Sequence, residues 1–263
     1  MTFRDLHAHG QLLVLANAWD AGSARLIESC GARAIATSSA VVAWANGYPD
    51  GDALPVPMLT RSIEAITRVI HIPLSVDSEG GYSNDPAKAG ENIFAIASAG
   101  AVGINLEDSS ESPDLLCAKI EAAKRAGERA GVDLFVNARI DVYLKKLVPR
   151  EQALDEGLRR AECYRAAGCD GIFLPLIADP NEIRTAVQAV DPLPLNVLAT
   201  PTLPPAAGLR ILGVRRLSAG SAIGRAATNL TRDVARQFLE DGDSDAMYTH
   251  IREMIDMNGL FPR

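Results

Sequence analysis

The chain has 263 residues, of which 48% are hydrophobic and 22% charged, a composition typical of a soluble globular protein rather than a disordered chain. Its net charge of −7 provides no basic stripe for phosphates, which excludes nucleic-acid binding, and no uncharged run is long enough to span a membrane. The N-terminal residues lack the apolar core of a signal peptide. We therefore expect a cytoplasmic protein without nucleic-acid or membrane partners.

Short β-prone runs alternate with longer helical stretches along the whole chain, and no Pro/Ser linker divides them. Predicted strands span 12–17, 34–38, 73–77, 102–107, 133–139, 171–175, 194–198 and 215–218. Apolar strands with little alternation suit a parallel sheet that is buried on both faces, and eight of them are the number that a closed barrel needs. The sequence predicts a single-domain (β/α)8 TIM barrel over residues 1–263, with a doubly wound open sheet as the alternative.

Glycines mark the ends of several predicted helices. Ala-Gly or Cys-Gly precedes a strand at Gly31, Gly100 and Gly168, where glycine lets the helix stop and the chain turn back to the sheet. The chain also lacks G-x-G-x-x-G after its first strand, which counts against a dinucleotide-binding open sheet. These signals favour the barrel.

The C-terminal part is predicted to be helical beyond the last strand. Small residues over 218–224 indicate either close packing at a helix start or a phosphate site. Residues 226–263 predict an amphipathic helical extension with a break at 241–243. We expect this extension to pack on the barrel or on a neighbouring subunit.

Acidic residues gather at the carboxyl ends of the predicted strands, where a barrel has its active site. Asp77 and Glu79 follow the third strand, Glu107 ends the fourth, and Asp50 joins this cluster from the loop after the second. Converging carboxylates repel one another unless a cation offsets them. Oxygen ligands favour Mg²⁺ over Zn²⁺, with Asp77 as the direct ligand and the other three acting through water. The alternative is that these acids pair only with Arg139 and nearby lysines.

Two further polar residues are expected to contact a substrate. Arg139 ends the fifth strand and faces the same mouth, where its guanidinium could clamp a substrate carboxylate through two parallel hydrogen bonds. A structural ion pair with Asp141 or Glu107 is the alternative. Asn196, in the seventh predicted strand, is also expected to bind the substrate.

Six short motifs follow one another along the chain. They are NAWDAGSA at 17–24, ATSSA at 36–40, GYPDG at 47–51, DSEGGY at 77–82, GINLED at 103–108 and NARID at 137–141. In this order and spacing they resemble the isocitrate lyase and phosphoenolpyruvate mutase superfamily, most closely a phosphoenolpyruvate mutase-like member with a short loop. The resemblance covers almost the whole chain.

The resemblance implies a Mg²⁺-dependent barrel that acts on 2-oxo acids or their phospho relatives through an enolate-like or oxyanion transition state. It implies that Ser38, with the backbone of Ser39 and Ala40, binds the substrate carboxylate. By the same similarity Arg139 holds the substrate, while the four acids form the inner and outer shell of the metal. Family members often form tetramers in which a C-terminal helix packs on or swaps with a neighbour, so a homo-oligomer, dimer or tetramer, is expected here.

The chain departs from both diagnostic acid–base sets of this superfamily. Lyases carry a Lys-Arg-Cys-Gly type loop after the Glu-Asp pair, but the loop here is the short segment 109–113, and Cys117 falls on the following helix, where packing is its expected role. Ser109 replaces the lysine that mutases and phosphonopyruvate hydrolases show. Pro175 and Leu176 stand where lyases present a glutamate and mutases a histidine.

We predict a Mg²⁺-dependent lyase or decarboxylase that cleaves a carbon–carbon bond of a small 2-oxo or 2-hydroxy (di)carboxylic acid through an enolate-like intermediate. Without the loop cysteine, proton transfer falls to Asp50, Tyr82 or a metal-bound water. Phosphonate chemistry, of the mutase or hydrolase kind, is the second hypothesis and is weakened by the missing lysine. The third is a 2-oxo-acid-binding protein without turnover, which the short loop favours because it shields a reaction poorly from water.

Overall fold

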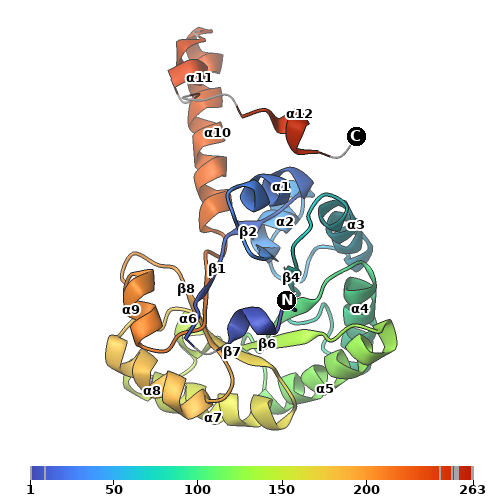
Figure 1. Cartoon of the computed structure of the whole chain (residues 1–263), viewed down its shortest axis with the longest axis vertical. Coiled ribbons are helices and arrows are strands. Elements are labelled where there is room, and N and C mark those ends of the chain that lie inside the picture. The colour runs from blue at the N-terminus through green and yellow to red at the C-terminus, as the bar shows by residue number, and fades with distance from the viewer. Residues whose placement is uncertain (1, 9, 243, 250, 252–254, 262–263) are drawn as a thin grey trace.

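The computed structural model describes residues 2–8, 10–242, 244–249, 251 and 255–261. Nine parallel strands form one sheet in the order β1-β9-β8-β7-β6-β5-β4-β3-β2. The strands are β1 (Leu13–Leu15), β2 (Asn17–Ala18), β3 (Ile35–Thr37), β4 (Leu74–Asp77), β5 (Gly103–Glu107), β6 (Phe135–Arg139), β7 (Gly171–Leu174), β8 (Leu195–Leu198) and β9 (Arg216–Ser218). Strand β1 pairs with β9, the last strand, and β2, which follows β1 directly, pairs with β3. The sheet therefore curls into a nearly closed barrel with helices around it (Figure 1). The predicted (β/α)8 barrel is confirmed.

Helices follow the strands, and the longer ones form an outer layer around the ring (Figure 1). They are α1 (Ala21–Ser29), α2 (Ser39–Ala45), α3 (Val56–Thr67), α4 (Pro86–Ser98), α5 (Pro113–Ala130), α6 (Val142–Lys145), α7 (Ala153–Ala166), α8 (Pro180–Val190) and α9 (Ala206–Ile211), with 3₁₀ turns η1 (Asp5–His7) and η2 (Arg150–Gln152). Gly100 shows why glycine ends α4: its φ is 113°, and a Cβ there would lie 2.8 Å from Thr67 Cγ2.

The first predicted strand, 12–17, forms two strands. Its lower part pairs with β9, with Leu13 beside Arg216, and its upper part pairs with β3, with Asn17 beside Ala36. Closing a cylinder requires the first strand to join the last strand and also the second one, and the chain divides these pairings at Ala16. Each of the other seven predicted strands contains one observed strand with slightly trimmed ends.

Alternation along β5 separates the barrel interior from the layer beneath the helices. Ile104 and Leu106 are fully buried in the apolar layer. Asn105 lies on the other face, where its side-chain oxygen accepts a 3.1 Å hydrogen bond from Arg216 across the barrel. Glu107, two residues farther along, therefore shares the inner face and lies at the carboxyl end of the barrel.

The N-terminal segment fills the opposite end of the barrel. Phe3 packs edge-on against Phe135, with ring centroids 5.5 Å apart, and His7 stacks on the same ring at 4.4 Å. A Cβ on Gly103 would lie 2.5 Å from Phe3 Cε1, so this glycine makes room for the phenylalanine. These aromatic rings leave the carboxyl ends of the strands as the end where a polar site can form.

After β9 the chain leaves the barrel in α10 (Ala222–Asp241), which projects from the ring with α11 (Asp245–Thr249) near its tip (Figure 1). The last helix, α12 (Met257–Leu260), returns to α1, where Arg25 Nε donates a 2.6 Å hydrogen bond to the Leu260 carbonyl. Helix α10 begins four residues before the predicted extension and ends at Gly242, which has a φ of 69°. Of the predicted break at 241–243, Asp243 lies outside the described residues.

Small residues at the start of α10 allow close helix packing. A Cβ on Gly224 would lie 2.6 Å from Val41 Cγ1 of α2, and the Gly220 amide donates a 2.9 Å hydrogen bond to Asn17 Oδ1. The segment 218–224 thus provides contact with the rest of the barrel. Within the described parts of the chain, no helix combines the length and apolar character needed to cross a membrane.

Candidate active site

A cavity of about 420 Å³ lies at the carboxyl ends of β4, β5 and β6. Its lining residues are Ser39, Asp50, Gly51, Asp52, Glu79, Glu107, Ser109, Arg139, Leu144 and Lys145. A larger cavity of about 670 Å³ lies at the opposite end of the barrel, but its one lining acid, Asp133, is paired with Arg4 at 2.8 Å. Only the smaller cavity gathers several carboxylates, and it lies where a barrel enzyme carries out its chemistry.

Asp77 ends β4 beside this cavity. Its backbone amide donates a 2.9 Å hydrogen bond to Thr37 Oγ1, and its Oδ2 accepts a long, 3.4 Å bond from the Ser39 amide. Its other carboxylate oxygen, Oδ1, is buried and has no hydrogen-bond partner among the described residues. A buried carboxylate oxygen without a partner is costly unless a ligand or water completes it, so Oδ1 is a candidate position for a cation.

Glu79 is held in the loop after β4 by two neighbours. The Asp52 amide donates to its Oε2, and the Tyr82 hydroxyl donates to its Oε1 over 3.3 Å. Burial raises the pKa of Glu79 to about 7, and the nearby carboxylates of Asp52, Asp77 and Asp50 add to this rise. Without a compensating cation, the Glu79 carboxylate is therefore partly protonated near neutral pH.

The backbone around the cavity is strained. Asp52, Glu79, Tyr82 and Ser109 have φ values of 56°, 48°, 57° and 48°, in the left-handed region that side chains seldom adopt. Strain of this kind persists only where surrounding contacts enforce it, and it gathers at functional sites. Here it directs the Asp52 amide toward the Glu79 carboxylate and the Ser109 hydroxyl toward the Glu107 carboxylate.

Glu107 and Arg139 face each other at the ends of β5 and β6. Arg139 Nη1 lies 2.5 Å from Glu107 Oε2, while its Nε and Nη2 bind Asp141 at 2.7 and 3.0 Å. The Ser109 hydroxyl donates a 2.8 Å bond to Glu107 Oε1. Burial raises the pKa of Glu107, with the Asp141 and Asp77 charges adding to it, even though Arg139 opposes the shift.

The ion pairs considered as the alternative role of Arg139 are therefore present, and both acids take part. The edge of the guanidinium formed by Nε and Nη2, which could bind a carboxylate through two hydrogen bonds, is occupied by Asp141 and is not open for a ligand. Its role as a clamp on a substrate carboxylate stays a prediction.

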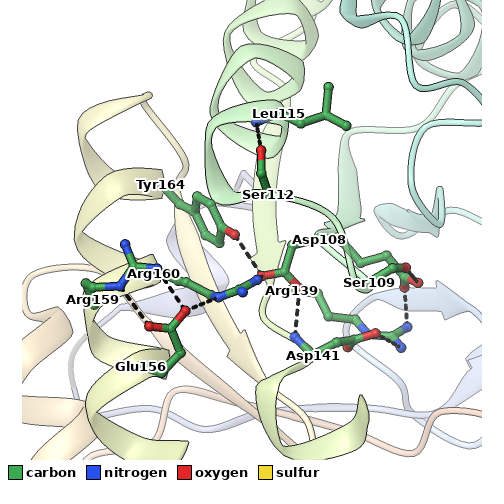
Figure 2. Close-up of polar contacts among 11 residues, drawn as sticks. Asp108, Ser109, Ser112, Leu115, Arg139, Asp141, Glu156, Arg159, Arg160 and Tyr164 are labelled. Atoms are coloured by element: carbon green, nitrogen blue, oxygen red, sulfur yellow. Dashed lines mark hydrogen bonds and ion pairs between the residues drawn. The ribbon is translucent and has the colours of Figure 1, made fainter. Parts of the chain in front are cut away.

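Asp108, next to Glu107, points away from the cavity into a buried network (Figure 2). Its Oδ2 accepts hydrogen bonds from Arg160 Nη1 at 2.8 Å and from the Tyr164 hydroxyl at 2.7 Å, both on α7. Its Oδ1 accepts a 2.9 Å bond from the Asp141 amide. Helix α7 is thus connected through two acids to the guanidinium of Arg139.

The remaining predicted residues lie around the cavity or below it. Ser38 is buried at the N-cap of α2 with no capping bond from its side chain, and Ala40 is buried as the second residue of that helix. Tyr82 is committed to Glu79 through its hydroxyl. Asn196 is fully buried in β8, bonded to Ser218 at 3.3 Å, and does not line the cavity. Its assignment to substrate binding has no support in this geometry, because it lies within the packed interior.

One carboxylate oxygen at this site, Asp77 Oδ1, is open to bind a metal directly. In the part of the chain that the structure describes, no three His, Cys, Asp or Glu side chains converge on a single ion position. Mg²⁺ usually takes one or two carboxylates directly and keeps several waters, so it does not require such a cage. The donor set fits this ion, because Asp77 Oδ1 is open and the acids lining the cavity offer only oxygen.

The sequence had not indicated several residues of the site. Asp52 follows the predicted Asp50 by two positions in the same loop, and this spacing could have drawn attention to it. Asp108 could have been found from strand alternation, since a residue next to an inward-facing glutamate must point outward. Lys145 had no such signal, because its place depends on the short helix α6.

Comparison with known proteins gives a consistent set of relatives. The family described as phosphoenolpyruvate phosphomutase matches residues 3–239. An uncharacterized protein of Mycobacterium tuberculosis is 38% identical over 230 residues, which are 84% of this chain and 82% of the relative. An oxaloacetate decarboxylase of Paraburkholderia xenovorans is 30% identical over 203 residues, 72% of this chain and 64% of the relative.

Solved structures agree with the sequence matches. A protein from Burkholderia cenocepacia, provisionally named a phosphonomutase, has a TM-score of 0.83 at 42% identity, covering 89% of this chain and 97% of that one. A phosphonopyruvate hydrolase in complex with oxalate and Mg²⁺ has a TM-score of 0.79 at 27% identity, covering 95% and 91%. The barrel fold is shared with proteins that are named for several reaction types.

Proposed function

The chain belongs to the phosphoenolpyruvate phosphomutase family, and on that basis we propose that it is a Mg²⁺-dependent carbon–carbon lyase or decarboxylase acting on a small 2-oxo or 2-hydroxy (di)carboxylic acid through an enolate-like intermediate. The observation that carries the proposal is the unpartnered Oδ1 of Asp77 beside a cavity lined by carboxylates. The oxaloacetate decarboxylase among its relatives supports the reaction type, and the relative crystallised with oxalate and Mg²⁺ supports the cofactor.

In this proposal Asp77 is the direct ligand of Mg²⁺, and Glu79, Glu107 and Asp50 act through water. Bound Mg²⁺ would polarise the 2-oxo group and offset negative charge as the bond opens, an effect worth several kcal/mol. The protein residues set the position of these acids: Tyr82 and Asp52 hold Glu79, while Arg139 and Ser109 hold Glu107. The Ser38–Ala40 segment at the start of α2 stays the proposed site for the substrate carboxylate.

Proton transfer is assigned to Asp50 rather than to Tyr82. The Asp50 side chain is exposed and lines the cavity, so it can exchange protons with solvent and reach a ligand. The Tyr82 hydroxyl is bonded to Glu79, and burial together with that carboxylate raises the pKa of Tyr82, so it retains its proton. Tyr82 therefore positions Glu79 and serves as a hydrogen-bond donor.

Phosphonate chemistry is the second candidate, favoured by the likeness to the phosphonomutase and phosphonopyruvate hydrolase structures. The cations that line the cavity are Arg139 and Lys145, and Arg139 is already paired with two acids. A phosphonate dianion would thus meet one uncommitted cation, which favours a carboxylate substrate.

A substrate panel with Mg²⁺ and with EDTA tests the proposal. Oxaloacetate, 2-methylisocitrate, phosphonopyruvate and phosphoenolpyruvate are supplied, and release of pyruvate, glyoxylate, CO₂ and phosphate is recorded. Turnover of a carbon-only substrate that EDTA abolishes supports the proposal, whereas phosphate release from phosphonopyruvate, or its interconversion with phosphoenolpyruvate, supports the second candidate. Thermal stabilisation by an oxo-acid with Mg²⁺ but no product from any substrate would identify a binding protein without turnover.

We also propose that the protein is a homo-oligomer in which α10 packs on a neighbouring copy. Leu230, Phe238 and Leu239 of this projecting helix are exposed, Leu239 to 82%. A groove beside the base of α10 is lined by Trp19, Trp44 and other largely apolar residues. An amphipathic helix that leaves its own barrel with apolar side chains exposed is best stabilised by burying them against a second copy.

A further inference from the structure

The two cations that line the cavity differ in what they already bind. The Arg139 guanidinium is committed to Glu107 and Asp141 through three of its nitrogens. The Lys145 side chain is exposed, lines the same cavity, and forms no hydrogen bond or ion pair with any described residue, although its charge acts on Asp141 at longer range. Lys145 is therefore the cation in this cavity that is free to bind a negatively charged group of a ligand.

The position of Lys145 relative to the acids follows from helix α6. This helix begins directly after Asp141, and the Lys145 amide donates a 2.7 Å hydrogen bond to the Asp141 carbonyl. Lys145 thus lies one helical turn, roughly 6 Å along the axis, from the acid that holds Arg139. The Oδ1 atom of Asp77 is buried beside the cavity, whereas the Lys145 side chain is exposed, so we take Asp77 to mark the inner end of the site and Lys145 its outer end.

The other charges of the cavity give this lysine a selective effect. Asp50, Asp52, Glu79 and Glu107 also line it, so a second anionic group on a ligand would be repelled almost everywhere along the wall. An ammonium group at the outer end supplies one charge-assisted hydrogen bond for that group. A ligand with a single carboxylate at the inner end gains nothing from it.

We propose that Lys145 binds the distal carboxylate of the substrate, so that the site selects dicarboxylic 2-oxo acids over monocarboxylic ones. This inference rests on the proposed function, because it assumes that the other end of the ligand lies beside Asp77. A single ammonium group suits a carboxylate, whereas a phosphonate dianion would call for several donors.

Lys146 provides a matched control for Lys145. It is the next residue, equally a lysine and also exposed, but it lines a different cavity with Tyr143, Val148 and Arg150. Changing each lysine to glutamine removes the same charge at nearly the same place and preserves side-chain length. A general electrostatic effect would weaken ligand binding in both variants, whereas loss of a subsite would weaken it only when Lys145 is changed.

The test measures dissociation constants by titration calorimetry in Mg²⁺ for K145Q, K146Q and the unmodified protein. The ligands are oxalate, whose two carboxylates are directly joined and leave no group that could reach Lys145, and oxaloacetate and 2-oxoglutarate, which carry a further carboxylate beyond the 2-oxo-acid end. We expect K145Q to weaken both oxo-diacids about tenfold, as the loss of one charge-assisted hydrogen bond would. Oxalate binding should not change, and K146Q should bind all three ligands as before.

Three results would overturn the inference in distinguishable ways. Equal weakening of oxalate and the oxo-diacids in K145Q, or no weakening at all, excludes a distal subsite while leaving the proposed function intact. Phosphonopyruvate is titrated in the same way, and a larger effect of K145Q on its binding than on that of oxaloacetate would assign the lysine to a phosphonate. Failure of the unmodified protein to bind any of these ligands with Mg²⁺ removes the proposed function and the subsite together.

Discussion

The backbone amide of Asp141 donates a 2.9 Å hydrogen bond to Asp108, and the Asp141 carboxylate in turn holds the guanidinium of Arg139 (Figure 2). Because Asp108 is itself held by Arg160 and Tyr164, the orientation of a residue at the cavity depends on a helix behind the barrel wall. A change in α7 should therefore be felt at the site without altering any residue that a ligand touches.

Tyr164→Phe should destabilise the fold by about 1–2 kcal/mol, because it removes one hydrogen bond to a buried carboxylate and leaves that oxygen to Arg160 alone. Urea unfolding measures the change. Arg159→Gln is the control on the same helix: its ion pair with Glu156 is largely exposed on the arginine side, and its loss should cost less than about 1 kcal/mol. Equal losses in the two variants would contradict the role given to Asp108.

Asp77→Ala should abolish the Mg²⁺ dependence of oxo-acid binding, since it removes the open carboxylate oxygen at the inner end of the cavity. Titration of the variant with Mg²⁺ in the presence and absence of oxalate measures this. Asp77→Asn is the companion variant, because it keeps the shape and loses the charge, and it should bind Mg²⁺ far more weakly. A variant whose ligand binding still responds normally to Mg²⁺ would refute the ligand assignment.

In the absence of metal, stability should fall as pH rises from about 4.5 to about 7. The folded chain retains a proton on Glu79, whose pKa is about 7, while the unfolded chain releases it near the ordinary value of 4.5. More protons are bound in the folded state across this window, so its contribution is lost as pH rises through the folded pKa.

Urea unfolding in EDTA from pH 4.5 to 8 measures this dependence, and Glu79→Gln should reduce its slope, while Glu107, whose pKa is also raised, supplies the remainder. Glu91→Gln is the control, because Glu91 is an exposed acid paired with Arg129 on the outer helices. If the Glu79 variant kept the slope of the unmodified protein, the proton would have to reside elsewhere.

Size-exclusion chromatography with light scattering should give a mass that is a multiple of the 28.0 kDa chain. Leu239→Glu should shift the protein toward the monomer, because it replaces the most exposed large apolar side chain of α10 by a charged one that would be buried in the proposed contact. Arg236→Glu, on the same helix, replaces one charged residue by another and serves as the control. A single-chain mass for the unmodified protein would end the oligomer proposal.

The positions of the strands could be predicted because their signals are local. Apolar β-prone runs and the glycines that end helices identified the barrel, and the rule that active sites lie at strand ends directed attention to Asp77, Glu79 and Glu107. The division of the first strand was not predictable in the same way. It depends on which neighbour each half pairs with, and that is set only when the cylinder closes.

The partners of charged residues were the least predictable part of the site. Arg139 was expected to bind a ligand, but its Nε and Nη2 donate hydrogen bonds to Asp141, two residues along the chain. Arg216 gave no sign of being buried, since it follows another arginine, yet it crosses the barrel to Ser75 and Asn105. Such pairings depend on which strands meet in space, and a local pattern contains no information about that.

The contact between Phe3 and Gly103 couples two positions that are far apart in the chain. Any side chain at 103 would need space that the phenylalanine ring already fills, so Gly103→Ala alone should be harmful. Trimming Phe3 to valine in the same chain should relieve the overlap and act as a second-site suppressor. A variant of this barrel could thus carry a larger residue at position 103 of β5 and a smaller one at position 3 of the N-terminal segment, provided that both substitutions occurred together.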